Sequence, residues 1–128
     1  MSDTADRSDD DETRIVVIDD YPDAVASLVA ALEDHGCVVR SASDGLSALD
    51  LIESFEPHCV LLDIQMPGLD GLTLAQRLRD RHGNDIVLIA ITGGSPADKT
   101  VAATFDLVDH WFTKPIDIRK LMQLVRAG

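Results

Sequence analysis

The sequence predicts an α/β fold, in which five parallel strands form one open, doubly wound sheet with helices on both of its faces. Three observations support this prediction. Short apolar runs occur five times along the 128 residues, stretches with helical periodicity separate them, and polar side chains follow four of the five runs. Strict alternation of strand and helix favours a parallel sheet, and a chain of this length forms a single domain. We expect the strand order 2-1-3-4-5.

The five apolar runs are the predicted strands. A continuous apolar run of about five residues is typical of a strand buried on both faces of a parallel sheet. We therefore expect both faces of each strand to be covered. The runs are RIVVI (14–18), CVVRS (37–41), HCVLL (58–62), IVLIAI (86–91) and HWFT (110–113).

Helices are predicted between these runs, where apolar residues recur at helical spacing. Asp44 and Asp70 each precede Gly and Leu, and a short acidic side chain favours the N-cap position of a helix. Residues 96–106 have the weakest apolar pattern of the predicted helices. The four stronger patterns are Ala24, Leu28 and Leu32; Leu46, Leu49 and Ile52; Leu72, Ala75 and Leu78; and Ile118, Leu121 and Val125.

The chain is acidic, with a formal charge of −12, and residues 1–13 contain six acids against one arginine. We expect a disordered acidic leader over 1–13 and a folded domain over 14–128. An acidic domain without a Lys/Arg cluster is a poor match for nucleic acid or an anionic membrane, and no apolar run has the length of a membrane span. The composition therefore favours a cytoplasmic protein whose partners are proteins or cations.

Two groups of side chains are expected to be structural. Cys37 and Cys59 lie at the start of apolar sequence, where a buried reduced thiol is usual. The predicted strand order separates their strands by a third strand, which exceeds the reach of a disulfide. Arg77, Arg79 and Arg81 are expected to form the solvated face of the third helix.

Polar residues follow the predicted strands. Asp19 and Asp20 follow the first strand, Asp63 the third, Thr92 the fourth and Lys114 the fifth. In an open parallel sheet, ligands bind beyond the carboxyl ends of the strands, where the strand order reverses. With the order 2-1-3-4-5, the carboxylates of the first and third strands flank that position. We therefore expect one site that contains all five residues.

The chemistry of these side chains favours phosphoryl transfer assisted by a metal ion. Clustered carboxylates repel one another unless a cation neutralises them, and hard oxygen ligands favour Mg²⁺, with Mn²⁺ as an alternative. A carboxylate can also act as a nucleophile that holds a phosphoryl group. Lys114 and the Thr92 hydroxyl could bind the remaining phosphoryl oxygens.

Each of these residues also has an ordinary structural explanation. Asp19 and Asp20 could cap the first helix, which has Pro22 in its first turn. Lys114 could be a solvated lysine, and Trp111 a packed aromatic side chain. Taken together, these explanations would require several independent coincidences at four strand ends on one rim, so a functional site is the better hypothesis.

Four motifs resemble those of the receiver domain of two-component response regulators, which has a flavodoxin-like fold. The motifs are VIDD (17–20), LLDIQMPGLDG (61–71), IAITGG (89–94) and WFTKPID (111–117). The resemblance covers residues 14–126. It rests on the order and spacing of all four motifs rather than on any one of them.

The resemblance implies a role for each acidic residue. Asp63 is implied to be the phosphoacceptor. Asp20 is implied to ligate Mg²⁺ directly and Asp19 through water. The backbone carbonyl of Gln65 is implied to supply another metal ligand.

The resemblance also implies a switch. Thr92 matches the switch hydroxyl, Lys114 the phosphate-binding lysine, and Trp111 the aromatic residue that moves with the switch. The bond between Lys114 and Pro115 matches one that is usually cis in the family, a form that only proline adopts at low cost. Leu107 replaces a common glycine, and leucine would be strained in a left-handed conformation.

The function implied is signalling, and the chain is not expected to be an enzyme in its own right. The donor would be a sensor histidine kinase or a histidine phosphotransfer protein. A target protein would bind the face formed by the fourth helix, fifth strand and fifth helix. The alternatives are a pseudo-receiver that serves only as an interaction module, and a receiver that is part of a longer regulator or hybrid kinase. A phosphatase with an aspartyl nucleophile is disfavoured because Gln65 stands where such enzymes have a second acid.

Overall fold

The computed structural model of the protein describes residues 13–64, 71–93 and 106–127. Several predictions lie outside these ranges. They concern residues 1–12 of the leader, the metal ligand Gln65, the N-cap Asp70 and nearly all of the predicted helix 96–106.

Five strands and four helices occur in the described ranges, in the order predicted from the sequence. The first and fifth strands have the predicted bounds, whereas the other three begin and end one residue later. This shift makes Asp63 and Thr92 the last residues of their strands. The elements are β1 (Arg14–Ile18), α2 (Pro22–Asp34), β2 (Val38–Ala42), α3 (Gly45–Phe55), β3 (Cys59–Asp63), α4 (Gly71–His82), β4 (Val87–Thr92), β5 (His110–Thr113) and α6 (Ile118–Ala127).

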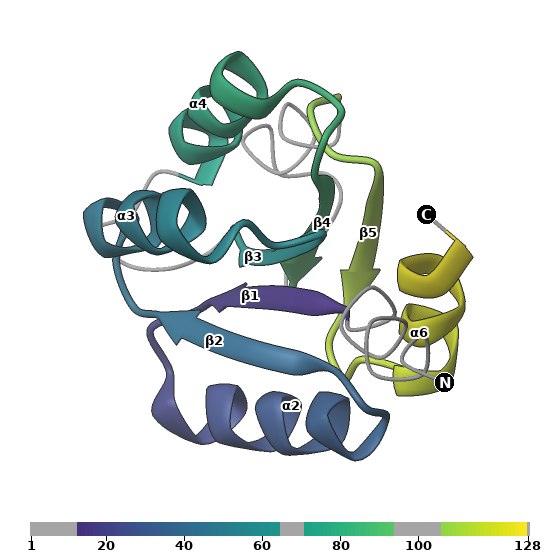
Figure 1. Ribbon diagram of the computed structural model, residues 1–128. Helices are drawn as coiled ribbons and strands as arrows, with labels where there is room; N and C mark the ends of the chain where they lie inside the picture. The colour runs from purple at the N-terminus through teal and green to yellow at the C-terminus, as the bar shows by residue number, and fades with distance from the viewer. Residues whose placement is uncertain (1–12, 65–70, 94–105, 128) are drawn as a thin grey trace, which may run out of the picture.

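The sheet is parallel and has the order β2-β1-β3-β4-β5, which confirms the predicted topology. Figure 1 shows α2 and α6 on one side of this sheet and α3 and α4 on the other. The position where the strand order reverses lies between β1 and β3. The carboxyl ends of these two strands therefore adjoin the position where the sequence predicts a site.

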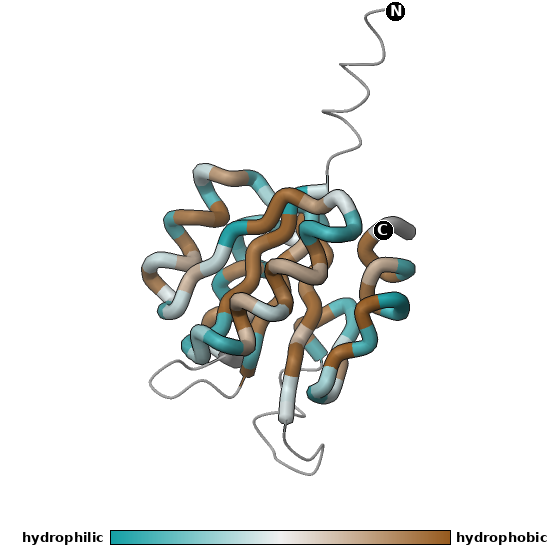
Figure 2. The backbone as a smooth tube through the Cα atoms, turned by 90° about the horizontal axis from the view of Figure 1, so that it is seen from below, coloured by the Kyte–Doolittle hydropathy of each residue, from teal (hydrophilic) through white to brown (hydrophobic). Residues whose placement is uncertain are grey.

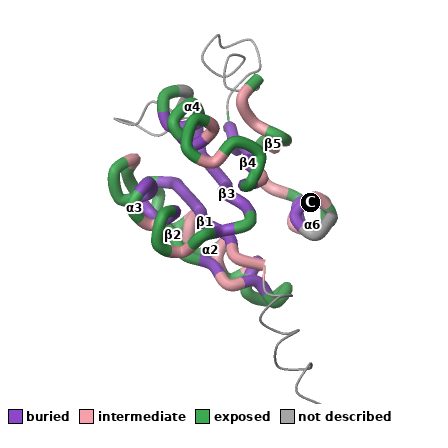
Figure 3. Tube along the Cα trace, turned by 45° about the horizontal axis from the view of Figure 1, so that its top comes forward, coloured by how far each residue is buried: buried purple, intermediate pink, exposed green. Residues whose placement is uncertain are grey.

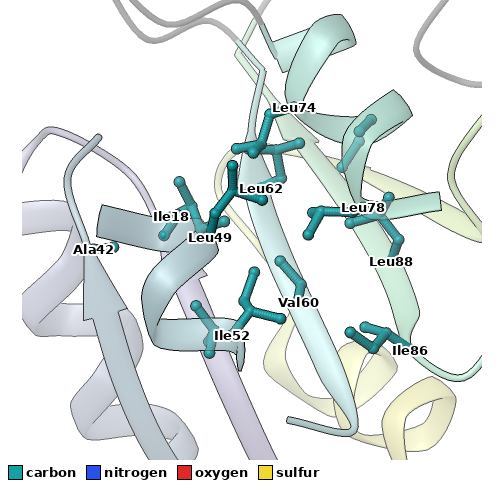
Figure 4. Packing of buried hydrophobic residues seen from close by; sticks show 14 of the residues in the cluster. Ile18, Ala42, Leu49, Ile52, Val60, Leu62, Leu74, Leu78, Ile86 and Leu88 are labelled. Carbon is teal, nitrogen blue, oxygen red and sulfur yellow. The ribbon is translucent and has the colours of Figure 1, made fainter. Parts of the chain in front are cut away.

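Two layers of apolar side chains cover the two faces of the sheet. One layer packs β1, β3 and β4 against α3 and α4, and Figure 4 shows Leu49 of α3 among Ile18 and Leu62 of the strands. The other layer packs the same strands against α2 and α6. In Figure 2 the apolar colour is accordingly concentrated along the strands. These layers hold the strand ends in fixed relative positions.

Burial differs between the central and the outer strands. The residues of β3 are all buried, and so are nearly all those of β1 and β4, as Figure 3 shows in purple. The prediction that every strand is buried on both faces is wrong for β2 and β5, where exposed positions interrupt the pattern. Both lie at the edges of the described sheet, with a neighbouring strand on one side only.

The start of α3 confirms one predicted cap and corrects one predicted core residue. The Asp44 carboxylate accepts hydrogen bonds from the Ser47 backbone N–H at 2.8 Å and from its hydroxyl at 3.0 Å. Leu49 and Ile52 are buried as predicted, but Leu46 is 75% exposed. A three-residue step turns each residue by about 60° around the helix axis, so Leu46 lies away from the side of α3 on which Ala48, Leu49 and Ile52 are buried.

Other structural predictions concern thiols and backbone conformation. Cys37 and Cys59 are both buried and form no disulfide, as predicted, and burial raises the pKa of the Cys59 thiol. The Lys114–Pro115 bond is cis. Leu107 does not have a positive φ, so it avoids the strain expected in a left-handed conformation. None of the helices in the described ranges combines the length and apolar composition that crossing a bilayer requires.

Hydrogen bonds from Arg14 hold β1 to the end of α3. Its guanidinium donates to the carbonyl oxygens of Phe55 at 3.1 Å and Glu56 at 2.8 Å, which satisfies acceptors at the end of the helix. Glu56 has a φ of 52°, in the left-handed region, and ends α3. The Arg14 backbone N–H donates to Nδ1 of His58 at 3.0 Å.

His58 should make the stability of the protein depend on pH. Burial and the charge of Arg14 lower the pKa of His58 below its ordinary value of 6.5, and Nδ1 accepts a hydrogen bond only when it carries no proton. The unfolded chain therefore binds this proton more readily than the folded chain. The free energy of unfolding should decrease as the pH falls below the ordinary histidine pKa.

Urea unfolding of the wild type and of His58→Gln between about pH 7.5 and 5.5 checks this prediction, because only the wild type can take up this proton. The variant should show a smaller decrease in unfolding free energy over that range. The same decrease in both proteins would contradict it.

Candidate functional site

The sheet brings together three of the side chains that the sequence places at strand ends. The Lys114 ammonium donates a hydrogen bond to Oδ2 of Asp63 at 2.8 Å. The same ammonium lies 3.6 Å from Oδ2 of Asp19. Asp19 and Asp63 are both 7% exposed. Two buried carboxylates from neighbouring strands therefore share one lysine.

Asp19 also holds the backbone at the start of α2. Its Oδ1 accepts the Tyr21 N–H at 3.0 Å, and its own N–H donates to the Ala42 carbonyl at 3.2 Å. Tyr21 is the N-cap residue and Pro22 begins the helix. Asp19 therefore does not cap α2, which has no side-chain cap hydrogen bond; one of the two Asp19 oxygens fixes the turn before the helix. The other oxygen faces Lys114.

Asp20 differs from its neighbour because it is exposed. Asp20 lies two positions beyond the end of β1, and its carboxylate lies at the surface of the site. Among the described residues, no three acidic, histidine or cysteine side chains converge as metal ligands. The close cluster of three carboxylates predicted from the sequence is therefore reduced to a buried pair with a third acid beside it.

Burial and the charges of the neighbouring side chains together shift the pKa values in the site. Burial raises the pKa of Asp19 above its ordinary value, and the negative charge of Asp63 adds to this effect. Burial lowers the pKa of Lys114, but the hydrogen bond with Asp63 and the charges of Asp63 and Asp19 outweigh it, so the net pKa is raised. One ammonium faces two carboxylates, which leaves the buried group with a negative charge when all three are ionised. A site with this balance favours a cation.

The donor set suits Mg²⁺. This ion prefers oxygen ligands and is usually held by one or two carboxylates, with water and phosphate oxygens in its other positions. Asp19 and Asp63 supply two carboxylates from adjacent strands, and Asp20 supplies a third at the surface. Gln65, the remaining predicted ligand, lies outside the described residues.

Thr92 is the last residue of β4, and Trp111 lies in β5. These two strands follow β3 in the order of the sheet. Thr92 is fully buried, and its carbonyl accepts the Lys114 backbone N–H at 3.0 Å. Trp111 pairs with Ala90 across the β4–β5 register and is 45% exposed. The indole lines a surface hollow of about 710 Å³ between β5 and α6, which also includes Pro115. The segment from Trp111 to Lys114 thus connects the site with this hollow.

Two grooves open onto Asp19 from opposite sides of α2. One, of about 310 Å³, lies between α2 and the segment before α6, and Lys114 is one of its lining residues. The other, of about 710 Å³, lies between α2 and α3 and includes Asp20 and Ser43. Asp19 therefore borders two grooves that open to solvent although it is nearly covered itself.

Arg79 is a connecting residue that the sequence prediction missed. The predicted solvated arginine face is correct for Arg77, which is exposed, and for Arg81, which pairs with exposed Glu53. The Arg79 side chain is only 18% exposed and pairs with Asp109 at 2.8 Å. Arg79 follows the buried Ala75 by four positions, so it lies on the buried side of the helix. That spacing was the available signal.

Comparison with known proteins identifies the family. A family model described as the response regulator receiver domain matches residues 15–126. The chain is 33% identical over 129 residues to the sensor histidine kinase GacS of Pseudomonas protegens, and the match covers 93% of this chain and 14% of GacS. It is 36% identical over 114 residues to the response regulator MprA of a Mycobacterium species, covering 89% of this chain and 49% of MprA. The chain thus spans about half or less of the length of these relatives.

Solved structures show the same fold. A two-component response regulator from Clostridium difficile matches with a TM-score of 0.81 at 24% identity, covering 91% of this chain and 94% of that one. The response regulator TrrA from Thermotoga maritima matches with a TM-score of 0.75 at 30% identity, covering 90% of this chain and 97% of that one. The TrrA structure is a complex with Mg²⁺–BeF. Since the family model spans nearly all of the described sheet, the chain belongs to the receiver domain family of two-component response regulators.

Proposed function

We propose that this receiver domain accepts a phosphoryl group onto Asp63 from a phosphohistidine of a partner protein. The observation that carries the proposal is the geometry around Asp63. This carboxylate ends a buried strand, lies nearly covered at the position where the strand order reverses, and is hydrogen-bonded to Lys114 at 2.8 Å. A nucleophile in such a position needs few other groups, because phosphoryl transfer depends mainly on positioning and on stabilisation of charge.

The proposed step forms one bond and breaks one bond. A carboxylate oxygen of Asp63 attacks phosphorus, while the bond between phosphorus and the donor's imidazole nitrogen breaks. The electron pair of that bond stays on the imidazole nitrogen, which takes up a proton. Lys114, already within hydrogen-bond distance of Asp63, neutralises charge on the transferred oxygens, and the Thr92 hydroxyl binds one of them.

The proposed metal ligands are the carboxylates of Asp19, Asp20 and Asp63 and the backbone carbonyl of Gln65. Asp20 binds directly and Asp19 through water, since one Asp19 oxygen is already bonded to the Tyr21 N–H. Mg²⁺, or Mn²⁺ in its place, would offset the repulsion between the acids and the incoming phosphoryl group.

The proposed output is a change in the surface near Trp111. Binding of the phosphoryl oxygens by Thr92 and Lys114 would displace the ends of β4 and β5, and Trp111 lies three residues before Lys114. The hollow between β5 and α6 would then change shape, and a target protein would recognise it. The cis bond at Pro115 belongs to the same segment.

The proposed setting follows from this role. The donor is a sensor histidine kinase or a histidine phosphotransfer protein, and the domain acts in the cytoplasm as residues 14–128 of the chain. It transfers no group to a small-molecule substrate, so its only chemistry is its own phosphorylation and dephosphorylation. A receiver that binds partners without phosphorylation is the alternative.

Incubation of the protein with acetyl phosphate and Mg²⁺, followed by intact-mass measurement, distinguishes these functions. Phosphorylation should add about 80 Da, for one phosphoryl group. When the incubation with acetyl phosphate contains a chelator that removes the metal, the protein should keep its unphosphorylated mass. No mass change in either condition would favour the interaction module.

Asp20→Asn should reduce the affinity for Mg²⁺ by at least about 10-fold, corresponding to about 1.4 kcal/mol, because a charged ligand becomes neutral while the exposed position tolerates the change. This affinity is measured by following Trp111 fluorescence as Mg²⁺ is added, or by calorimetric titration. Asp23→Asn, at an exposed acid in the first turn of α2, is the matched control. Equal affinities in all three proteins would remove Asp20 from the metal site.

A further inference from the structure

Arg79 joins α4 to the segments that enter β4 and β5. Its guanidinium donates to the carbonyl oxygens of Leu107 at 2.6 Å, Gly83 at 2.9 Å and Ile86 at 3.2 Å. It also donates to the Asp109 carboxylate at 2.8 Å. These acceptors come from both sides of β4 in the sequence. One planar side chain therefore fixes three segments relative to one another, which the point charge of a lysine could not do.

Asp109 completes this connection by bonding to β4. Its Oδ2 accepts the Leu88 N–H at 2.8 Å, and its own N–H donates to the Leu88 carbonyl at 2.8 Å. The hydrogen bonds from Arg79 and Leu88 outweigh the effect of burial and lower the pKa of Asp109. The carboxylate consequently stays ionised in the neutral pH range, and the pair with Arg79 persists there.

In the ion pair with Arg79, Asp109 is the partner that lies close to Trp111 along the chain. Asp109 directly precedes β5, and Trp111 follows it by two residues. At the other end of the strand, Lys114 is bonded to Asp63. The four residues of β5 therefore lie between two charged attachments. One of them, at Lys114, belongs to the proposed phosphorylation site, and the other, at Asp109, lies at the opposite end of the sheet.

We propose that Arg79 is a positioning residue for the switch: through Asp109 it holds the start of β5 in place, so that a displacement of Lys114 moves Trp111 rather than the whole strand. This inference rests on the proposed function, since it requires that phosphorylation displaces Lys114. β5 is also paired with β4 along its length; without the attachment at Asp109, a displacement at Lys114 can be shared by the whole strand, and Trp111 then keeps its surroundings. A strand held at its start must change its conformation near Trp111.

Arg79→Gln tests this role, because it removes the charge and most of the donors. Two signals are measured on folded protein with Mg²⁺ and beryllofluoride. The bound ¹⁹F signal reports uptake of the phosphoryl mimic, and Trp111 emission reports the switch. Uptake should stay within about two-fold of the wild type, whereas the emission change should fall to about half or less, because only the coupling between the two events is lost.

Three further variants separate coupling from stability. Arg81→Gln removes the exposed pair with Glu53 on the same helix and should leave both signals unchanged. Asp109→Asn keeps an oxygen for the Leu88 N–H but loses the ion pair, and it should also reduce the emission change. If Arg79→Gln does not fold, Asp109→Asn is the variant that tests the proposal. Arg79→Lys should restore the emission change only in part.

The outcomes are distinguishable. A wild-type protein that takes up no beryllofluoride overturns the proposed function and this inference with it. A wild type that responds, with equal emission changes in Arg79→Gln and Asp109→Asn, overturns the role of Arg79 alone. Loss of beryllofluoride uptake in these variants also overturns it, because Arg79 would then act on the phosphorylation site itself.

Discussion

Asp63→Asn should abolish phosphorylation and leave the fold intact. The amide of asparagine is a poor nucleophile, and removal of a nucleophile from an active site lowers the rate by about 10²-fold or more. The fold should survive, because the change removes one of two buried carboxylates that repel each other. Lys114 keeps Asp19 as a partner at 3.6 Å. Intact-mass measurement after treatment with acetyl phosphate, together with circular dichroism and thermal unfolding, tests both parts.

The matched control is Asp50→Asn, at an exposed acid on α3, which should label as the wild type does. If Asp63→Asn were labelled to the same extent as the wild type, the phosphoacceptor would be another residue. If it failed to fold, Asp63 would have a structural role that its geometry does not suggest.

Leu49→Ala should lower the free energy of unfolding by about 2–5 kcal/mol, the range for a buried leucine whose removal leaves a cavity. Leu49 is 8% exposed and packs in the layer between the sheet and α3. Leu46→Ala is the same substitution three positions earlier in the same helix, at a residue that is 75% exposed. It should change stability by less than about 0.5 kcal/mol.

Urea unfolding of both variants gives this comparison directly, because helix propensity changes equally in the two. Comparable losses of stability would mean that Leu46 is buried, as its spacing suggested. The side of α3 that faces the sheet would then be wrongly assigned.

The contrast between these two leucines shows how far the sequence predicts the fold. Apolar runs and helical spacing were sufficient for the element order, because each element must bury its apolar side against its neighbours. The strand order does not follow from them and depended on the resemblance to the receiver domain. The spacing did not distinguish Leu46 from Leu49, since successive three-residue steps turn around the helix and do not show which residue faces the sheet. It likewise did not show that β2 and β5 would be exposed at many positions, because a strand's place in the sheet determines its burial.

The site was predictable in composition but not in geometry. Asp19, Asp63 and Lys114 could be assigned to one rim, because residues after parallel strands meet at one edge. The direct bond between Lys114 and Asp63, and the use of one Asp19 oxygen by the Tyr21 N–H, depend on side-chain distances that no spacing rule contains. Arg79 was missed for a similar reason. Its spacing from Ala75 indicated the buried side of the helix, but its partners, three backbone carbonyl groups and the Asp109 carboxylate, could not be identified from any spacing.

The measurement that tests the central claim most directly is the location of the phosphoryl group in the wild-type protein. After brief treatment with acetyl phosphate and Mg²⁺, borohydride reduction converts an aspartyl phosphate to homoserine, and peptide mass spectrometry then identifies the modified residue. We predict modification at Asp63 and its absence from samples treated with chelator. Modification at another residue, or a protein that acquires no phosphoryl group while it binds Mg²⁺, would contradict the account.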